Sequence, residues 1–193
     1  VGVTGTNGKT TIATLLYTMF EKAGYKSGLL STVKIKVHQA EFPATHTTPD
    51  SLTINYYLNE MVESGVAYCF MEVSSHGIHQ SRTEGLHFAG GIFTNLSHDH
   101  LDYHATFAEY RDVKKSFFDN LPKTAFALSN IDDKNGSVML QNTKAQKRTY
   151  SLKSYSDYKA YVLENQFIGL LLKIDNQEVS TKLIGNFHAY NLL

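Results

Sequence analysis

Residues 5–11 have the composition of a phosphate-binding turn. They read Gly-Thr-Asn-Gly-Lys-Thr-Thr and stand between a short apolar stub and a run with helical periodicity. Backbone N–H groups at a helix N-terminus can cradle phosphates, Lys9 can reach the outer phosphate groups, and the Thr10 hydroxyl can hold Mg²⁺. The spacing departs from the common G-x-x-x-x-G-K-[ST] pattern, because Val3 occupies the position of the first glycine. The alternative is a glycine-rich turn that binds no ligand.

Polar clusters follow two further apolar runs. Residues 72–76 close the run 66–73, and residues 95–102 close the run 89–96. A parallel sheet carries its chemistry beyond the carboxyl ends of its strands. A carboxylate and imidazoles beside a phosphate loop suit a second divalent ion, although Mg²⁺ usually prefers oxygen ligands. In the alternative interpretation, Glu72 caps the next helix and the histidines lie on surface turns.

The spacing of His98, His100 and Asp102 also imitates the start of the H-x-H-x-D-H motif of metallo-β-lactamase-like hydrolases. That motif places a histidine directly after the aspartate, whereas this chain has Tyr103 there and His104 one position later. The departure counts against a metal-dependent hydrolase, which stays open as an alternative.

A lysine lies in the apolar stripe of a predicted helix over residues 106–121. The helix opens with Thr106-x-x-Glu109, a capping-box pattern. At about 100° per residue, Lys114 falls within the apolar stripe, whereas Lys115 points away from it. A lysine in such a stripe commonly extends its ammonium to solvent. The position alone therefore does not separate a functional lysine from a structural one.

These groups need a scaffold of alternating strands and helices. The sequence predicts helices at 12–23, from Thr48-Pro49 to before Gly65, and at 106–121, and strands at 1–4, 66–73, 89–96 and 124–129. Such alternation predicts an α/β fold whose mostly parallel sheet is covered by helices on both faces. The short alternating stretches 148–152, 161–164, 167–174 and 178–184 predict a small antiparallel sheet near the C-terminus.

The composition excludes several classes of protein. The chain has 193 residues, with 18 Lys and Arg against 18 Asp and Glu, which argues against a nucleic-acid partner or an anionic membrane surface. No apolar run approaches the ~20 residues of a membrane span. The single cysteine, Cys69, cannot form an internal disulfide, so we expect a cytoplasmic protein. Val1 in place of methionine, and Leu193 inside an apolar pattern, predict that both ends are cut from a longer chain.

Six motifs together resemble the ATP-binding central domain of the Mur ligases, most of all the E type. They are residues 4–11, 47–49, 71–77, 93–97 and 99–104, and the sequence Asn130-x-Asp132-Asp133. The resemblance implies a P-loop α/β domain of an ATP-dependent ligase in peptidoglycan synthesis. Such an enzyme phosphorylates the carboxylate of UDP-N-acetylmuramoyl-L-alanyl-D-glutamate and joins the acyl phosphate to a diamino acid, L-lysine or meso-diaminopimelate.

Two alternatives to this family stay open. Folylpolyglutamate synthetase shares the fold, but it usually reads Gly-Lys-Gly-Ser where this chain has Gly-Lys-Thr-Thr at residues 8–11. A non-enzymatic nucleotide-binding module would also carry a phosphate loop. Competition by a glutamate-linked folate would indicate the first, and nucleotide affinity without turnover would indicate the second.

The resemblance also implies the site residues. ATP is expected to bind at Gly5, Thr6, Asn7, Gly8, Lys9, Thr10, Thr11 and Asn191. Two Mg²⁺ ions are expected at Thr10, Glu72, His100 and Lys114, with Lys114 as a CO₂-derived carbamate, and Lys9, His100 and Lys114 are the expected catalytic groups. The UDP-muramoyl substrate is expected at Thr47, Thr48, Ser74, Gln80 and Arg82. His46 and His188 stand where relatives carry asparagine, so their roles are left open.

The family architecture sets the domain organisation that we expect. Residues 1–193 match the central, ATP-binding domain, and the N-terminal UDP-binding and C-terminal amino-acid-binding domains are absent from this chain. We therefore expect an isolated domain that is inactive in ligation. We further expect a monomer with no nucleic-acid partner and no membrane insertion.

Overall fold

The computed structural model describes residues 1–97 and 103–193. In chain order the elements are β1 (Gly2–Thr4), α1 (Lys9–Lys22), β2 (Ser27–Leu30), β3 (Lys34–Val37), β4 (Ala40–Pro43), α2 (Ser51–Glu63), β5 (Tyr68–Glu72), α3 (Ser75–His79), β6 (Gly90–Phe93), α4 (Phe107–Asp119), β7 (Phe126–Asn130), α5 (Gly136–Met139), β8 (Gln146–Ser151), β9 (Tyr158–Gln166), β10 (Gly169–Ile174), β11 (Gln177–Thr181) and α6 (Asn186–Leu192). The strands form one sheet in the order β11-β10-β9-β8-β7-β6-β1-β5-β2-β3-β4.

The centre of the sheet is parallel, as predicted. β1 pairs in parallel with β5 on one side and with β6 on the other. β2, β7 and β8 extend this parallel region outwards. The carboxyl ends of β1, β5 and β6 therefore meet at one edge of the sheet, where a chain of this topology places its ligands.

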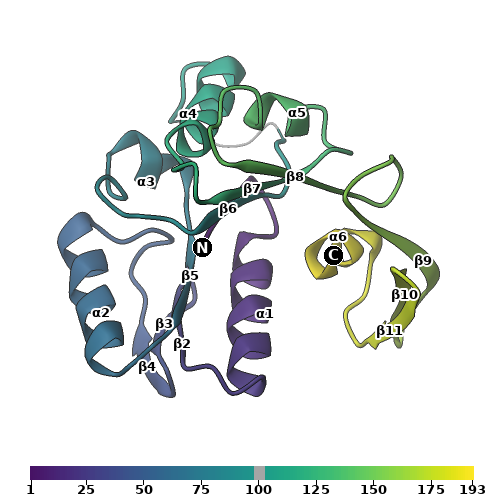
Figure 1. Cartoon of the computed structure of the whole chain (residues 1–193), viewed down its shortest axis with the longest axis horizontal. Helices are drawn as coiled ribbons and strands as arrows, with labels where there is room; N and C mark the ends of the chain where they lie inside the picture. The colour runs from purple at the N-terminus through teal and green to yellow at the C-terminus, as the bar shows by residue number, and fades with distance from the viewer. Residues whose placement is uncertain (98–102) are drawn as a thin grey trace.

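Helices cover both faces of the parallel region (Figure 1). One core lies under α2, α4 and α5 and includes Ile54, Tyr110, Phe118 and Met139. The other lies under α1 and includes Ile12, Ala13 and Tyr17. Strands buried on both faces have apolar runs instead of an alternating pattern, which is why the central strands were recognisable in the sequence.

Several boundaries differ from the sequence prediction. Helix α2 is capped by Asp50, whose carboxylate accepts a hydrogen bond from the Thr53 N–H at 3.0 Å, and not by Thr48. The Thr48 hydroxyl is engaged elsewhere, because it donates to the Glu72 carbonyl oxygen at 2.9 Å. In the capping box of α4, Thr106 accepts from the Glu109 N–H as predicted, but the Glu109 carboxylate binds the Ala105 N–H instead of that of Thr106.

The C-terminal region combines a correct prediction with an incorrect one. β9, β10 and β11 are antiparallel, as expected. β8, however, pairs in parallel with β7 over residues 146–150 and belongs to the main sheet, because alternation predicts a strand but not its direction. β8 then pairs with β9 at only two positions, Tyr150 with Tyr158 and Ser151 with Lys159.

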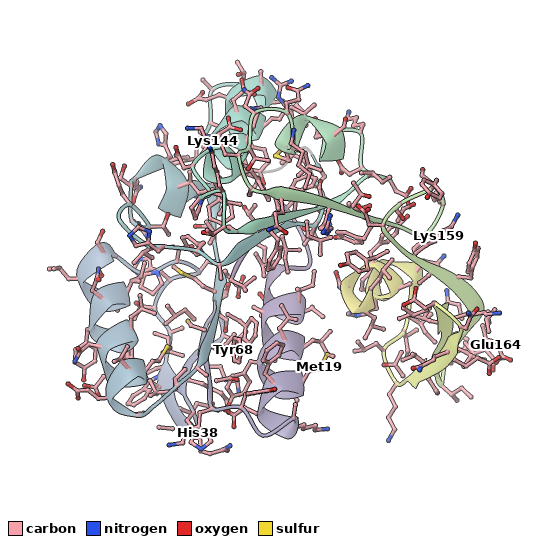
Figure 2. The ribbon with its side chains drawn as sticks, viewed as in Figure 1. Met19, His38, Tyr68, Lys144, Lys159 and Glu164 are labelled. Carbon is pink, nitrogen blue, oxygen red and sulfur yellow. The ribbon has the colours of Figure 1, made fainter. Side chains whose placement is uncertain are left out.

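β9, β10, β11 and α6 form a small unit beside α1 (Figure 1). Its own core consists of Leu170, Leu172 and Ala189. Figure 2 shows Met19 on the side of α1 that faces this unit, and Glu164 on its far side. Within the described residues, no helix has the length and apolar content needed to cross a bilayer.

Candidate active site

The turn between β1 and α1 requires its two glycines. Gly5 has a φ of +146° and Gly8 a φ of +93°, both in the region that side chains other than glycine rarely adopt. A Cβ atom on Gly5 would collide with the Thr94 hydroxyl, and one on Gly8 would lie 2.6 Å from Oδ1 of Asn191. The glycines therefore allow the turn to approach both the end of β6 and helix α6.

The segment after β6 holds this turn in place. The Thr6 N–H donates to the Asn95 carbonyl oxygen at 2.8 Å, and the Asn7 N–H donates to Oδ1 of Asn95 at 3.0 Å. The Thr94 hydroxyl donates to the Asn7 carbonyl oxygen at 2.6 Å. Helix α1 begins at Lys9 without a side-chain cap, the arrangement that suits an anion at its N-terminus.

The Lys9 side chain folds back over the turn. Its ammonium donates to the carbonyl oxygens of Gly5 at 3.0 Å and Thr6 at 2.8 Å. Thr10 and Thr11 occupy the first turn of α1, because the helix begins at Lys9, three residues before the predicted start at residue 12. A positive side chain, a helix N-terminus and two hydroxyls thus converge at the end of β1, which is suitable for binding phosphate.

Lys114 reaches the same turn from the other side. It is only 1% exposed, and its ammonium donates to the Gly5 carbonyl oxygen at 3.1 Å and lies 3.5 Å from the Thr4 hydroxyl. The ammonium also lies 4.8 Å from the centre of the Tyr110 ring. The interpretation that Lys114 extends to solvent is therefore wrong.

Lys115 is also buried, which the helical periodicity did not predict. Its ammonium forms an ion pair with Asp119 at 2.7 Å, one turn along α4. The prediction that Lys115 points away from the Lys114 stripe agrees with this contact.

Tyr110 links α4 to the phosphate turn, a role that the sequence analysis missed. Its hydroxyl lies 3.1 Å from the Thr6 hydroxyl, which also accepts the Ser97 N–H at 3.0 Å. Tyr110 stands four residues before Lys114, so it shares the same helix face. The spacing of four residues between Tyr110 and Lys114 was the sequence signal from which this role could have been predicted.

Glu72 lies at the carboxyl end of β5 and is fully buried. Its carboxylate accepts hydrogen bonds from the Thr32 N–H at 2.7 Å and the Thr32 hydroxyl at 3.1 Å. The alternative that Glu72 caps the next helix is wrong, since Ser74 caps α3 by accepting from the Gly77 N–H at 3.0 Å. A buried carboxylate with neutral donors on Thr32 fits a divalent cation, so the residues present are compatible with the expected Mg²⁺.

The five residues expected at the muramoyl substrate lie together beside Glu72. Thr48 is the centre of this group: its hydroxyl accepts the Ser74 N–H at 2.9 Å, and its carbonyl oxygen accepts from Nη1 of Arg82 at 2.7 Å. Gln80 orients the Arg82 guanidinium, because Oε1 of Gln80 accepts from Nε at 2.9 Å and from Nη2 at 2.6 Å. The Thr47 hydroxyl lies 3.1 Å from that of Thr32. Thr32 itself gave no sequence signal.

The remaining metal prediction lies outside the described residues. His100, together with His98 and Asp102 of the hydrolase alternative, falls in the segment between residues 97 and 103. Neither prediction is tested by the geometry.

A cavity of about 730 Å³ lies over the phosphate turn. It is lined by Asn7, Gly8, Thr11, Thr94, Asn95, Asn130, Asp132, Asp133, Asn186, Phe187, His188, Tyr190 and Asn191. These residues come from the turn after β1 and the first turn of α1, from the ends of β6 and β7 and the segments that follow them, and from α6. Asn191, which the sequence analysis expected at ATP, lines this cavity, and His188 lines it too, with its ring centre 4.3 Å from that of Phe187.

The sequence matches the Mur ligase middle domain over residues 3–193. The chain belongs to this family. Membership favours a ligase over the metal-dependent hydrolase, and it agrees with the parallel sheet and phosphate turn of the structure.

Relatives of this Mur ligase domain match it over its whole length. It is 62% identical to the UDP-N-acetylmuramoyl-L-alanyl-D-glutamate--2,6-diaminopimelate ligase of Phocaeicola vulgatus and 58% identical to the protein of the same name from Bacteroides fragilis. In both cases the match covers 100% of this chain but only 40% of the relative. A solved structure with this name matches 99% of the chain and 40% of that structure, at a TM-score of 0.85 and 30% identity. MurF from Acinetobacter baumannii, at 13% identity, matches 98% of the chain and 40% of that structure with a TM-score of 0.76, which shows the shared fold alone.

Proposed function

We propose that this chain is the ATP-binding central domain of a ligase that joins 2,6-diaminopimelate to UDP-N-acetylmuramoyl-L-alanyl-D-glutamate. The relatives named above support the substrate pair. The observation that carries the proposal is the phosphate turn at residues 5–8, which is held by Asn95 and contacted by both Lys9 and Lys114. The UDP-binding and amino-acid-binding domains belong to other parts of the full-length protein in this proposal.

ATP binding uses the cavity over the phosphate turn. The first turn of α1 and the Lys9 ammonium receive the phosphates, because both present positive charge to the same point. The adenine occupies the part of the cavity lined by α6, where Asn191 offers an amide and Phe187 and His188 offer rings. The reaction consumes ATP, so we propose that it takes place in the cytoplasm.

The phosphoryl group passes from ATP to the terminal carboxylate of the muramoyl substrate. The acyl phosphate is then attacked by the amine of the diamino acid, an amide bond forms, and inorganic phosphate leaves. Such chemistry depends on positioning and charge neutralisation more than on a protein nucleophile. Arg82, oriented by Gln80 and anchored on Thr48, is suited to hold an anionic part of the substrate beside Glu72.

Mg²⁺ is held in this proposal by Glu72 and the Thr10 hydroxyl at one position and by His100 and a carbamate of Lys114 at another. When bound, the ions would neutralise charge on the phosphate groups. Lys114 is suited to carbamylation because its side chain is buried and its Nζ lies at the phosphate turn instead of in solvent. The carbamate would add a carboxylate, whose oxygens are ligands that Mg²⁺ prefers.

The decisive experiment measures amide formation by the full-length protein. Purified enzyme, ATP, Mg²⁺ and UDP-N-acetylmuramoyl-L-alanyl-D-glutamate are incubated with either meso-diaminopimelate or L-lysine, and product and phosphate release are quantified. With meso-diaminopimelate, we expect the amide product and inorganic phosphate to form in equal amounts. Inhibition by a glutamate-linked folate would favour the folylpolyglutamate alternative, and nucleotide binding without amide would favour a non-enzymatic module.

A further inference from the structure

Asp132, at the carboxyl end of β7, joins three segments that are distant in sequence. One of its oxygens accepts hydrogen bonds from the Ser151 and Ser154 hydroxyls at 2.7 and 3.0 Å. The other accepts the N–H groups of Leu152 and Lys153 at 2.8 and 3.0 Å. That second oxygen also accepts the Tyr190 hydroxyl of α6 at 3.0 Å. The carboxylate thus ties α6 and the β8–β9 connection to the main sheet.

The bond between Asp132 and Tyr190 is charge-assisted. Burial by itself would raise the pKa of Asp132, but the donors from residues 151–154 more than offset it and hold this pKa well below its usual range. Burial, followed by the nearby Asp132 carboxylate, raises the pKa of Tyr190 to about 12. At neutral pH an ionised carboxylate therefore accepts from a protonated phenol, which is stronger than a neutral pair.

Helix α6 is short and lacks a side-chain cap. It has seven residues, of which Ala189 is buried against Leu170 and Leu172, and Leu192 packs partly buried against the same cluster. Asn191 follows Tyr190 directly and lies so close to the phosphate turn that a Cβ on Gly8 would meet its Oδ1 at 2.6 Å. A small movement of α6 would therefore change the distance between Asn191 and the phosphate turn.

We propose that Asp132 is a positioning residue that acts through Tyr190 to hold α6, and hence Asn191, at the distance from the phosphate turn that tight nucleotide binding requires. The inference rests on the proposed function, because it assumes that the cavity takes a nucleotide. It assigns to the Asp132–Tyr190 bond a role in nucleotide affinity that is separate from folding.

The test uses the full-length protein and Mg-ADP as the probe, with affinity measured by calorimetry. Tyr190→Phe removes one hydroxyl and leaves the other donors to Asp132 in place. We expect its ADP affinity to fall about tenfold, as for a lost hydrogen bond to a charged group, and KM for ATP to rise with kcat within about twofold. Asp157→Asn is the matched control: Asp157 accepts from the N–H and hydroxyl of Thr149 in the same β8–β9 region, and it does not line the cavity. Its ADP affinity should equal that of the wild type.

A double-mutant cycle separates positioning from direct contact. If Tyr190 acts by placing α6, Tyr190→Phe should weaken ADP binding little further once Asn191→Ala is present. Fully additive losses, or an unchanged affinity in Tyr190→Phe alone, would overturn the inference. Lys9→Ala distinguishes the two levels of the argument. If it leaves ADP affinity unchanged the proposed function fails, whereas a loss in Lys9→Ala without one in Tyr190→Phe refutes the positioning role only.

Discussion

The ammonium of Lys114 lies 3.1 Å from the carbonyl oxygen of Gly5, across 109 residues of sequence. Helix α4 thereby contacts the phosphate turn from the interior of the protein, while Lys9 covers the same turn from α1. The amines of two lysines from different helices thus contact the same carbonyl group of the phosphate turn. This contact supports our proposal that Lys114 takes part in the active site.

We expect Lys114→Ala to reduce turnover of the full-length enzyme by at least about a hundredfold, the scale of losing a preorganised charge-stabilising group. Added formate or acetate should restore part of the rate, because a short carboxylate can occupy the space of the missing carbamate. Steady-state rates with and without these anions, and a carbamate signal in NMR spectra recorded under ¹³CO₂, are the measurements. If the Lys114→Ala variant is active and its rate does not respond to carboxylates, the role of Lys114 is structural.

Lys115→Ala is the control for this prediction. It removes the ion pair between the buried Lys115 and the partly exposed Asp119, so the free energy of unfolding should fall by about 1–2 kcal/mol. Turnover should stay close to that of the wild type. A large loss of turnover would mean that α4 as a whole, and not Lys114, is sensitive to substitution.

Lys9→Ala tests the phosphate turn. We expect kcat/KM for ATP to fall by about a hundredfold or more, since charge-assisted contacts to phosphate are the strong ones. Lys22→Ala, at the exposed last turn of the same helix, should leave kcat/KM unchanged. Near-normal rates in Lys9→Ala would be incompatible with our assignment of residues 5–11.

Gly8→Ala tests the close approach of α6. The substitution places an alanine at a φ of +93° and brings its Cβ to 2.6 Å from Asn191, so we expect a stability loss of about 1 kcal/mol and a clear loss of ADP affinity. Gly24 has a nearly equal φ of +90°, and a methyl group added there would meet nothing within 4 Å. Gly24→Ala should therefore cost similar stability in urea unfolding but leave ADP affinity intact.

The stability of the fold should depend on pH through Asp132. Its pKa is lower in the folded than in the unfolded protein, where it is about 3.9. The ionised carboxylate therefore stabilises the fold above about pH 4, and this contribution is lost as the pH falls further. Asp132→Asn should lower the free energy of unfolding by about 1–2 kcal/mol at pH 7, with the difference shrinking below pH ~4. Asp112→Asn, on the exposed surface of α4, should change little at either pH.

The isolated chain of 193 residues should bind ADP without forming amide. If the substrate-docking domains lie elsewhere in the full-length protein, the effective concentration that orientation supplies is lost. Product analysis by mass spectrometry on the isolated chain and the full-length enzyme, at equal concentrations, makes the comparison. Amide formation at comparable rates would contradict the proposed domain organisation.

The sequence predicted the parts of the structure that local patterns encode. The phosphate turn was recognisable because glycine, lysine and threonine follow a strand directly. Lys114 was recognisable because, at the helical period, it falls within the apolar stripe of a predicted helix. The hairpin of β3 and β4 was missed, since its strands have four residues each and largely lack an apolar run. The direction of β8 was wrong because alternation does not encode direction.

Contacts between distant residues could not be predicted from such local patterns. Thr32 donates to Glu72 across 40 residues, and Tyr190 donates to Asp132 across 58. Neither pair has a local signature that would indicate it, because both depend on how the loops after neighbouring strands meet. The family resemblance brought Glu72 into the site, but the residues that orient it became visible only in the fold.

The small core of Leu170, Leu172 and Ala189 has a consequence for hydrogen exchange. A unit with so little buried apolar surface can open without global unfolding, and its amides should then exchange sooner than those of β1 and β6. Such an opening would remove α6 from the cavity and leave the phosphate turn intact. Molecules in this open state lose affinity for nucleotide although the circular dichroism of the main sheet and its helices is retained. A bound nucleotide would therefore slow amide exchange in β9, β10 and β11, although these strands lie outside the cavity lining.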